Sequence, residues 1–343
     1  MIFHISTFSF SPVRTVLLLL FFPISGFAQL NWQNVDSSFG NLPSSVHVFR
    51  STTPIGGKPN IAYYVEADLK DLTLDFVVDT TYKRRLTPQQ FYAKRYDSMI
   101  QANATNFPLV VVNTSFFSFA TNQNLNVAIN RGQLIAYNVH TVYGRGKDTF
   151  TYRHPYGSAI GISKHRKADV AWLYTDSSRK FAYASQWPVP AFKDSAINHN
   201  YKYMMAKGAA TAPRPSKLKK WKMQTAVGGG PVLLQDGNIR ITNEEELKFN
   251  GKAIEDKHPR TAMGYTADGK LIILVVEGRH PNTAEGATLV QLAQIFKDLG
   301  CTEALNLDGG GSSCMLVNGK PTITVSDKEG QRPVPAVLMI FKR

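Results

Sequence analysis

Apolar runs along the chain predict a protein built mainly from short strands. Residues 61–69 and 72–78 are rich in β-branched and aromatic residues, and Asp71 between them predicts a hairpin. The continuously apolar run at 109–112 is typical of a buried strand. Further strands are expected at 125–129, 133–137, 158–162, 169–174, 232–239 with a turn inside, 261–266, 271–276, 315–317, 323–325 and 336–341. This pattern predicts an α+β fold with a mixed, mainly antiparallel sheet.

Two principal helices interrupt the strands. The first is expected at 87–102, where Thr87, Pro88 and Gln90 provide the start signals of a capping box. Its core-facing side chains are expected to be Tyr92, Tyr96, Met99 and Ile100. The second helix ends at Gly300 and is expected to bury Leu289, Leu292, Ala293, Phe296 and Leu299.

Each helix leads into a buried strand that has a polar residue at its end. The first of these strands ends at Asn113, and the second ends at Asn306-Leu307-Asp308. The repeat predicts a pseudo-duplicated core in which the two strand ends meet at one site. A structure with Asn113 and Asp308 on opposite faces would contradict this hypothesis. The Asn113 side chain is interpreted either as a hydrogen-bonding group for a ligand or as a cap of its own strand.

Residues 306–313 place an acid and three glycines at a strand end. Glycine lets the backbone approach a bound group, and successive free N–H groups form an anion-binding concavity. A carboxylate at Asp308 beside such amides would suit chemistry on a negatively charged substrate. The alternative is a tight turn that Asp308 only caps, because Asp-Gly is also a common turn signal.

Two arginines are expected at one end of a later hairpin. Antiparallel pairing of 261–266 with 271–276 brings Arg260 and Arg279 together, beside Glu277. Guanidinium groups bind phosphate oxygens in a planar, two-pronged way, so the pair indicates a phosphate site. An ordinary surface ion-pair cluster is the alternative. Farther upstream, the bare backbone of Gly229 and Gly230 predicts a second close approach to a ligand.

Five stretches of the chain, in this order, resemble the motifs of the phosphodiester glycosidase family: 113–117, 226–233, 260–265, 276–279 and 306–313. The likeness covers roughly residues 60 to 343 and is strongest after 224. An ordered set of motifs is far more specific than a lone glycine-rich loop. One position departs from the family pattern, since the family usually has Asp-Gly-Arg where this chain has Glu277-Gly278-Arg279.

The resemblance implies a glycosidase that acts on a sugar 1-phosphodiester of the N-acetylhexosamine-1-phosphate type, in a phosphorylated glycan. Glycosidases commonly use two carboxylates, and we assign Asp308 as nucleophile or base with Glu277 as its partner. This mechanism requires no cofactor. The residues expected to bind substrate or phosphate are Arg260, Arg279, Asn113, Gly229, Gly230, Asn306, Gly309, Gly310, Gly311, Ser312 and Ser313.

Two other functions fit the same residues. A metal-assisted phosphodiesterase would use Asp308 and Glu277 as oxygen ligands of a divalent cation. His258 and His280 flank the arginines, in keeping with that alternative. A surface-polysaccharide binding protein would keep the site without turnover. A nucleophilic serine is not expected, because no Gly-x-Ser-x-Gly elbow surrounds the serines of the central stretch.

The formal net charge of +14 favours phosphate-bearing or acidic partners. Nucleic acid is not expected as a partner, because the basic residues are scattered and no nucleic-acid fold signature occurs. Residues 1–28 contain Arg14, an apolar run at 16–22 and a small-x-small pattern, which predict a secretory signal peptide. The protein is therefore expected in the periplasm or medium if it is bacterial. No later segment has the length and apolar character of a membrane span.

The rest of the chain is expected as an N-terminal arm at 29–58 and a phosphodiester glycosidase-like domain at 59–343. A loop-rich insertion is expected at about 176–222, where proline and aromatic residues replace any clear periodicity. Cys301 and Cys314 bracket the central stretch. Export would permit a disulfide between them, and two buried free thiols are the alternative.

Overall fold

The computed structural model describes residues 29–104, 106–144, 146–212 and 217–343, so the predicted signal peptide at 1–28 lies outside the described residues. Every strand pairing in these ranges is antiparallel. The α+β class with mainly antiparallel sheets is therefore confirmed. None of the helices in the described ranges is long and apolar enough to span a membrane.

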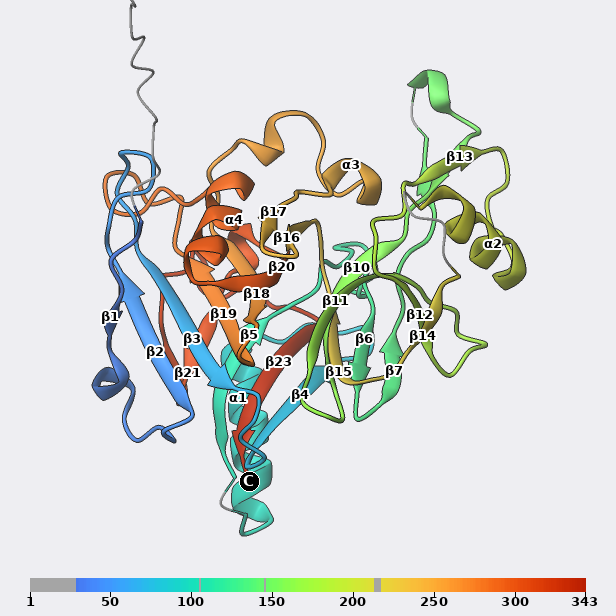
Figure 1. The fold of residues 1–343 in the computed structure, drawn as a ribbon. Helices are drawn as coiled ribbons and strands as arrows, with labels where there is room; N and C mark the ends of the chain where they lie inside the picture. Colours follow the sequence, from blue (N-terminus) through green and yellow to red (C-terminus); the bar gives the residue numbers. More distant parts are fainter. Residues whose placement is uncertain (1–28, 105, 145, 213–216) are drawn as a thin grey trace, which may run out of the picture.

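The strands form four sheets (Figure 1). The eight-stranded sheet has the order β1 (Gln33–Asn34), β2 (Val46–Ser51), β3 (Ala62–Asp68), β19 (Lys270–Val276), β18 (Arg260–Thr266), β20 (Cys301–Asn306), β16 (Val232–Gln235) and β17 (Asn238–Ile239). The five-stranded sheet has the order β22 (Lys320–Pro321), β21 (Met315–Val317), β5 (Pro108–Asn113), β23 (Ala336–Lys342) and β4 (Leu74–Thr80).

The other two sheets lie on the right of Figure 1. The seven-stranded sheet has the order β14 (Lys219–Trp221), β12 (Ala182–Ser185), β11 (Ala168–Tyr174), β10 (Gly157–Ser163), β15 (Met223–Gly228), β6 (Ala128–Asn130) and β7 (Gln133–Ala136). The three-stranded sheet has the order β13 (Phe192–Asp194), β9 (Tyr152–His154) and β8 (Val142–Tyr143). The helices are α1 (Pro88–Gln101), α2 (Tyr201–Thr211), α3 (Asn243–Glu246) and α4 (Leu289–Asp298), with 3-10 turns at η1 (Asp36–Phe39), η2 (Gly146–Asp148), η3 (Gly251–Ile254) and η4 (Gly310–Ser312).

The two predicted helices are confirmed, and the predicted buried face of α1 is confirmed in part, since Tyr92 and Met99 pack against the core. The capping box of α1 forms as expected, with Thr87 accepting from the Gln90 amide. Its buried anchor is Phe91, whereas Tyr96 and Ile100 are exposed. Only one side of α1 faces the five-stranded sheet, so the Tyr96 ring packs at the helix edge against Phe107 instead of entering the core. Helix α4 buries the face that the sequence predicts.

The predicted hairpin at 61–78 is wrong. Strands β3 and β4 belong to different sheets, because β3 pairs with β2 and β19 while β4 pairs with β23. Each strand gains a seven-residue register with a partner distant in sequence. The Asp71 carboxylate holds the connection by accepting from the Thr73 amide. Local β-propensity therefore located both strands but not their partners.

Three further segments differ from expectation. Residues 46–51, expected within a surface arm, form β2 inside the eight-stranded sheet, with Val46 and Val48 fully buried. The strand expected at 323–325 is absent from the described structure, and β21 pairs with the short β22 at 320–321. The region 176–222, expected to be loops, contains β12, β13, α2 and β14. Helix α2 has little apolar periodicity, which explains why the sequence pattern missed it.

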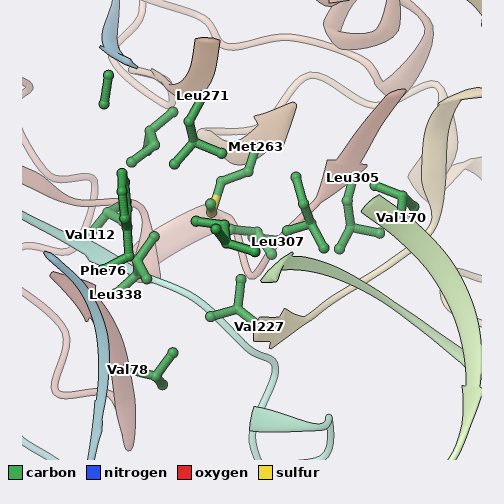
Figure 2. Packing of buried hydrophobic residues seen from close by; sticks show 14 of the residues in the cluster. Phe76, Val78, Val112, Val170, Val227, Met263, Leu271, Leu305, Leu307 and Leu338 are labelled. Atoms are coloured by element: carbon green, nitrogen blue, oxygen red, sulfur yellow. The ribbon is translucent and has the colours of Figure 1, made fainter. Parts of the chain in front are cut away.

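The main core lies where the inner faces of the three larger sheets meet. Figure 2 shows part of it, with side chains from β4, β5, β11, β15, β18, β19, β20 and β23. Burial of each large apolar side chain contributes about 1.5–3 kcal/mol, so this cluster fixes the relative positions of the strands. Leu305 and Leu307 on either side of Asn306 both point into it (Figure 2), which anchors the strand end that carries Asp308.

Candidate functional site

The end of β20 is held by backbone bonds from two other segments. The Leu307 amide donates to the Thr261 carbonyl at 2.9 Å, and the Asp308 amide donates to the Thr114 carbonyl at 2.8 Å. The Asn113 side-chain amide donates to the Asp308 carbonyl at 2.6 Å. The strand ends at Asn113 and Asp308 therefore meet, as the pseudo-duplication hypothesis predicts.

The Asn113 side chain ties these strand ends together. Its Oδ1 accepts from the Thr261 hydroxyl at 2.8 Å and from the Cys314 amide at 3.1 Å, and the residue is fully buried. The structure thus commits this side chain to protein partners, where the sequence left open a ligand contact. Cys301 and Cys314 are both buried free thiols, as the second alternative for them predicted.

The Asp308 carboxyl group is the most perturbed acid of this region. Asp308 as a residue is half-buried, and protein atoms surround its carboxyl group. This burial raises the pKa of Asp308 to about 7. The nearby Ser312 hydroxyl, the Arg332 guanidinium and the Gly309 amide favour the charged form but do not offset the burial. A carboxyl group with this pKa exchanges protons near neutral pH, as an acid or base in catalysis must.

Buried hydroxyl groups without a protein partner surround the strand ends. Thr114 and Ser115 follow Asn113, and Ser312 and Ser313 follow the three glycines. All four hydroxyl oxygens are buried and lack a hydrogen bond of standard geometry to another described residue, although the Ser312 hydroxyl lies close enough to Asp308 to favour its charged form. Asn306 Oδ1 is unpaired too, although its Nδ2 donates to the Gly230 carbonyl at 2.9 Å. Buried polar atoms are normally paired, so this group of five indicates a place for water or a polar ligand.

The glycines of the two motifs are required for packing. A Cβ at Gly229 would clash with the Asn306 carbonyl oxygen, and one at Gly311 would clash with the Asp327 carboxylate. Gly310 has a φ of 62° and lies beside the Arg279 guanidinium, 3.0 Å from the position of a Cβ. Protein atoms therefore fill the space that each missing side chain leaves.

The predicted hollow of free amides is largely absent. The amides of Gly310, Ser312 and Ser313 donate to the carbonyls of Pro259, Gly309 and Gly310, because the loop closes as the 3-10 turn η4. The Gly230 amide likewise donates to the Asn306 carbonyl at 2.7 Å. The polar lining of this site therefore consists mainly of hydroxyl groups and cationic side chains.

The two predicted arginines have different surroundings. Arg260 is buried, and its guanidinium donates to the Ala287 and Asp256 carbonyls at 2.8 and 2.9 Å. This burial lowers the pKa of Arg260 to about 10. Arg279 is exposed, and its guanidinium makes no hydrogen bond or ion pair within the described part of the chain. Of the two, Arg279 has the cationic group that is free to bind an anion.

Glu277 lies at the same sheet end with both carboxylate oxygens occupied. His280 Nδ1 lies 2.9 Å from Oε1, and the Thr324 amide donates to Oε2 at 2.9 Å. The residue is buried. Burial lowers the pKa of the neighbouring His258, and the charges of Arg260 and Arg279 lower it further. His258 is therefore poorly suited to add a third positive charge here.

Sequence reasoning missed two cations. Arg332 forms a two-pronged ion pair with Asp327 at 2.8 and 3.0 Å, and its charge acts on Asp308. Lys248 lies beside Gly230, where its Cε would contact an added Cβ, and its ammonium group sits 5.6 Å from the Phe116 ring centre. Burial lowers the pKa of Lys248. Neither belongs to a quoted motif, so only the folded chain brings them to this site.

Replacement of Arg332 tests how a neighbouring charge affects the pKa of Asp308, and the test does not depend on enzymatic activity. Arg332→Gln removes a positive charge that favours the ionised carboxyl group, so the pKa of Asp308 is expected to rise above about 7. The measurement is a carbon-13 NMR titration of aspartate-labelled protein. Asp327→Asn is the control, because it removes the ion-pair partner and keeps the Arg332 charge. An unchanged or lowered Asp308 pKa in Arg332→Gln would contradict this account.

The predicted site residues do not form a cluster of metal ligands. Among the described residues, one group of histidine and acidic side chains has three ligand atoms within 4.8 Å of one another. It consists of His154, Asp194 and His199 and lies in another part of the fold. Two large cavities of about 700 and 720 Å³ are also elsewhere and include none of the predicted residues. The candidate site is thus defined by its side chains around Asp308.

One family model and several known proteins are similar to parts of this chain. The phosphodiester glycosidase family model matches residues 189–341. N-acetylglucosamine-1-phosphodiester alpha-N-acetylglucosaminidase of Mus musculus is 28% identical over 95 residues, which are 25% of this chain and 18% of the mouse protein. The Bos taurus enzyme of the same name is 30% identical over a stretch of the same length and the same coverage.

A third relative is an uncharacterised prophage-derived protein, YomE, of Bacillus subtilis. It is 44% identical over 71 residues, which cover 21% of this chain and 11% of that protein. The chain therefore spans less than a fifth of the length of these three relatives.

Solved structures show a similar fold over most of the chain. The catalytic domain of zebrafish N-acetylglucosamine-1-phosphodiester alpha-N-acetylglucosaminidase matches with a TM-score of 0.56 at 21% identity, covering 92% of this chain and 89% of that one. A hypothetical protein from Synechocystis matches with a TM-score of 0.59 at 13% identity, covering 91% and 64%. The resemblance of this chain to the phosphodiester glycosidase family, predicted from its ordered motifs, is therefore confirmed, with the family model matching residues 189–341.

Proposed function

We propose that this chain is an exported glycosidase that hydrolyses a sugar 1-phosphodiester, of the N-acetylhexosamine-1-phosphate type, in a cell-surface or extracellular glycan. The family resemblance supports the reaction class, and the names of the mouse and cattle relatives support the sugar. The observation that carries the proposal is the Asp308 carboxyl group, whose pKa is about 7, beside unpaired buried hydroxyls and the free Arg279 guanidinium.

The reaction breaks the bond between the sugar C1 and the phosphate oxygen. A water oxygen becomes bonded to C1, and the phosphate leaves as a monoester with both bonding electrons. The second pKa of such a monoester is near 6 by analogy with phosphoserine, so the leaving group needs little protonation. The protein must therefore bind the phosphate and stabilise the positive charge that develops at C1.

In this mechanism the Asp308 carboxylate acts at C1, as nucleophile or as the base that takes a proton from water. A pKa of about 7 leaves a large ionised fraction at neutral pH and keeps the group basic enough to accept that proton. Glu277 is the second carboxylate, held in one orientation by His280 and the Thr324 amide. The distance between the two carboxyl groups would decide between retention and inversion.

The phosphate would be bound chiefly by Arg279, with Lys248 as a second cation. The hydroxyls of Thr114, Ser115, Ser312 and Ser313 would pair with sugar hydroxyls and phosphate oxygens, which satisfies their unused bonding capacity. Arg260 is buried and donates to the Ala287 and Asp256 carbonyls, so its role would be to support the surrounding backbone. No metal ion takes part in these steps.

Hydrolysis in oxygen-18 water tests the reaction class. The substrate is an α-N-acetylglucosamine 1-phosphodiester, with and without a chelator, and the products are followed by mass spectrometry. Label is expected in the freed sugar, with no dependence on chelator, and it should be lost in Asp308→Asn. Label in the phosphate, lost on chelation, would instead establish a metal-assisted phosphodiesterase. Binding of the substrate without any product would establish a binding protein.

A further inference from the structure

A second group of reactive side chains lies in the lobe built from β8, β9, β13 and α2. His154 ends β9, Asp194 ends β13, and His199 directly precedes the N-cap of α2. Asp194 Oδ1 lies 3.3 Å from His154 Nε2, and Asp194 Oδ2 lies 2.7 Å from His199 Nε2. One ligand atom from each residue falls within 4.8 Å of the others. Three side chains from separate segments thus converge on one point.

The hydrogen bonds of His154 leave one of its ring nitrogens without a suitable partner. Nδ1 faces the His140 carbonyl at 3.0 Å, and Nε2 faces Asp194 Oδ1 and the Ala196 carbonyl at 3.1 Å. All of these neighbours are acceptors, but a neutral imidazole has only one N–H. The side chain is only 1% exposed, so water cannot easily relieve the mismatch. A cation beside Nε2 would remove the mismatch, because Nε2 and the Asp194 carboxylate would then bind the cation instead of facing each other as acceptors.

The donor set selects the type of cation. Two imidazole nitrogens and a carboxylate suit zinc and similar divalent transition metals, whereas calcium and magnesium prefer oxygen ligands only. The His140 carbonyl fixes His154 with Nδ1 as donor and Nε2 as the free nitrogen, in the manner of outer partners of metal-bound histidines. We propose that His154, Asp194 and His199 bind one zinc-type divalent ion.

The position of the group assigns this ion a structural role. Strands β8, β9 and β13 are two or three residues long, and such short strands hold weakly by themselves. An ion shared by β9, β13 and the start of α2 would fasten all three. Figure 1 shows β13 and α2 at the upper right, apart from β20, the strand that leads to Asp308. The proposed ion is therefore independent of the proposed hydrolysis.

Zinc titration of the tag-free, full-length mature protein after chelator treatment and dialysis tests the proposal. Isothermal calorimetry is expected to show one tightly bound Zn²⁺ per chain, and added Zn²⁺ should raise the melting temperature. His199→Gln and Asp194→Asn should each weaken binding by about 100-fold or more. His165→Gln is the matched control, because His165 is exposed and lies on another loop. Binding that is absent, or equally strong in His199→Gln, would overturn the proposal.

Cobalt provides a second measurement in case the variants fold poorly. Co²⁺ bound to the unsubstituted protein by two imidazoles and a carboxylate should give visible absorption bands of a four- or five-coordinate site, and Zn²⁺ should abolish them by displacement. The absence of such bands at saturating Co²⁺ would overturn the proposal. Neither readout depends on enzymatic activity.

Discussion

Asp308→Asn is expected to lower kcat on a sugar 1-phosphodiester by about 10³-fold or more, which is the scale of removing a catalytic base or nucleophile. The substitution preserves the shape of the side chain and the backbone bonds from Thr114 and Asn113, so substrate binding should change far less than kcat. Steady-state kinetics of the purified protein measure both quantities. A KM that rises strongly at unchanged kcat would instead assign Asp308 to binding.

The same variant is expected to be more stable than the unsubstituted protein above neutral pH. The folded pKa of Asp308 is about 7, against a usual value of 3.8, so the folded state holds this proton more tightly than the unfolded chain does. Its contribution to stability is therefore lost as pH rises from about 4 through 7. Asparagine cannot ionise, so Asp308→Asn should escape a cost on the order of 4 kcal/mol at pH 8. Melting curves between pH 4 and 9 measure the difference.

Glu303→Gln is the matched control for this stability effect. Burial also raises the pKa of Glu303 to about 7, but its carboxylate is bound by Tyr265 and the Val170 amide between two sheets, away from the strand end. Its replacement should alter the pH dependence of stability and leave kcat unchanged. Stabilisation above neutral pH combined with lost activity is expected of Asp308→Asn alone. An Asp308→Asn protein that is active, or less stable at pH 8, would contradict the assignment.

The sequence predicted those parts of the fold that depend on local patterns. The capping box of α1, the hairpin of β18 and β19, and the buried strands before Asn113 and Asp308 all have short-range signals, and all form. The partner of a strand has no such signal, because a register of seven residues with a distant strand outweighs a nearby turn. This is why β3 and β4 were wrongly paired with each other.

The sequence predicted the position of the site better than it predicted the contacts of the site residues. Motif order located Asp308, Glu277 and Arg279, but it could not reveal that amides of the glycine loop would be used by the loop itself. Glycine has two uses, approach to a ligand and close packing of backbone, and the sequence does not distinguish them. Lys248 lies in the short segment between α3 and η3, and Arg332 lies in the loop between β22 and β23, so their positions depend on the whole fold.

Arg279→Gln is expected to lower kcat/KM for the phosphodiester by about 10²-fold. The guanidinium is exposed and has no hydrogen bond or ion pair to the described protein, so its bonding capacity remains available to phosphate oxygens. A charged hydrogen bond contributes about 1.5–3 kcal/mol, and 2.7 kcal/mol corresponds to 100-fold. Since φ at Arg279 is 64°, a β-branched replacement would add backbone strain, and glutamine avoids that complication.

The substrate decides whether this loss reflects phosphate recognition. An aryl N-acetylglucosaminide without phosphate should be hydrolysed with nearly equal kcat/KM by Arg279→Gln and the unsubstituted protein. Arg279→Lys separates charge from geometry, because lysine keeps the positive charge but cannot form the two-pronged contact. It should recover part of the kcat/KM for the phosphodiester. Equal losses on both substrates would show that Arg279 supports the glycine loop through Gly310, and the phosphate would then have to be bound by Lys248 and the unpaired hydroxyls.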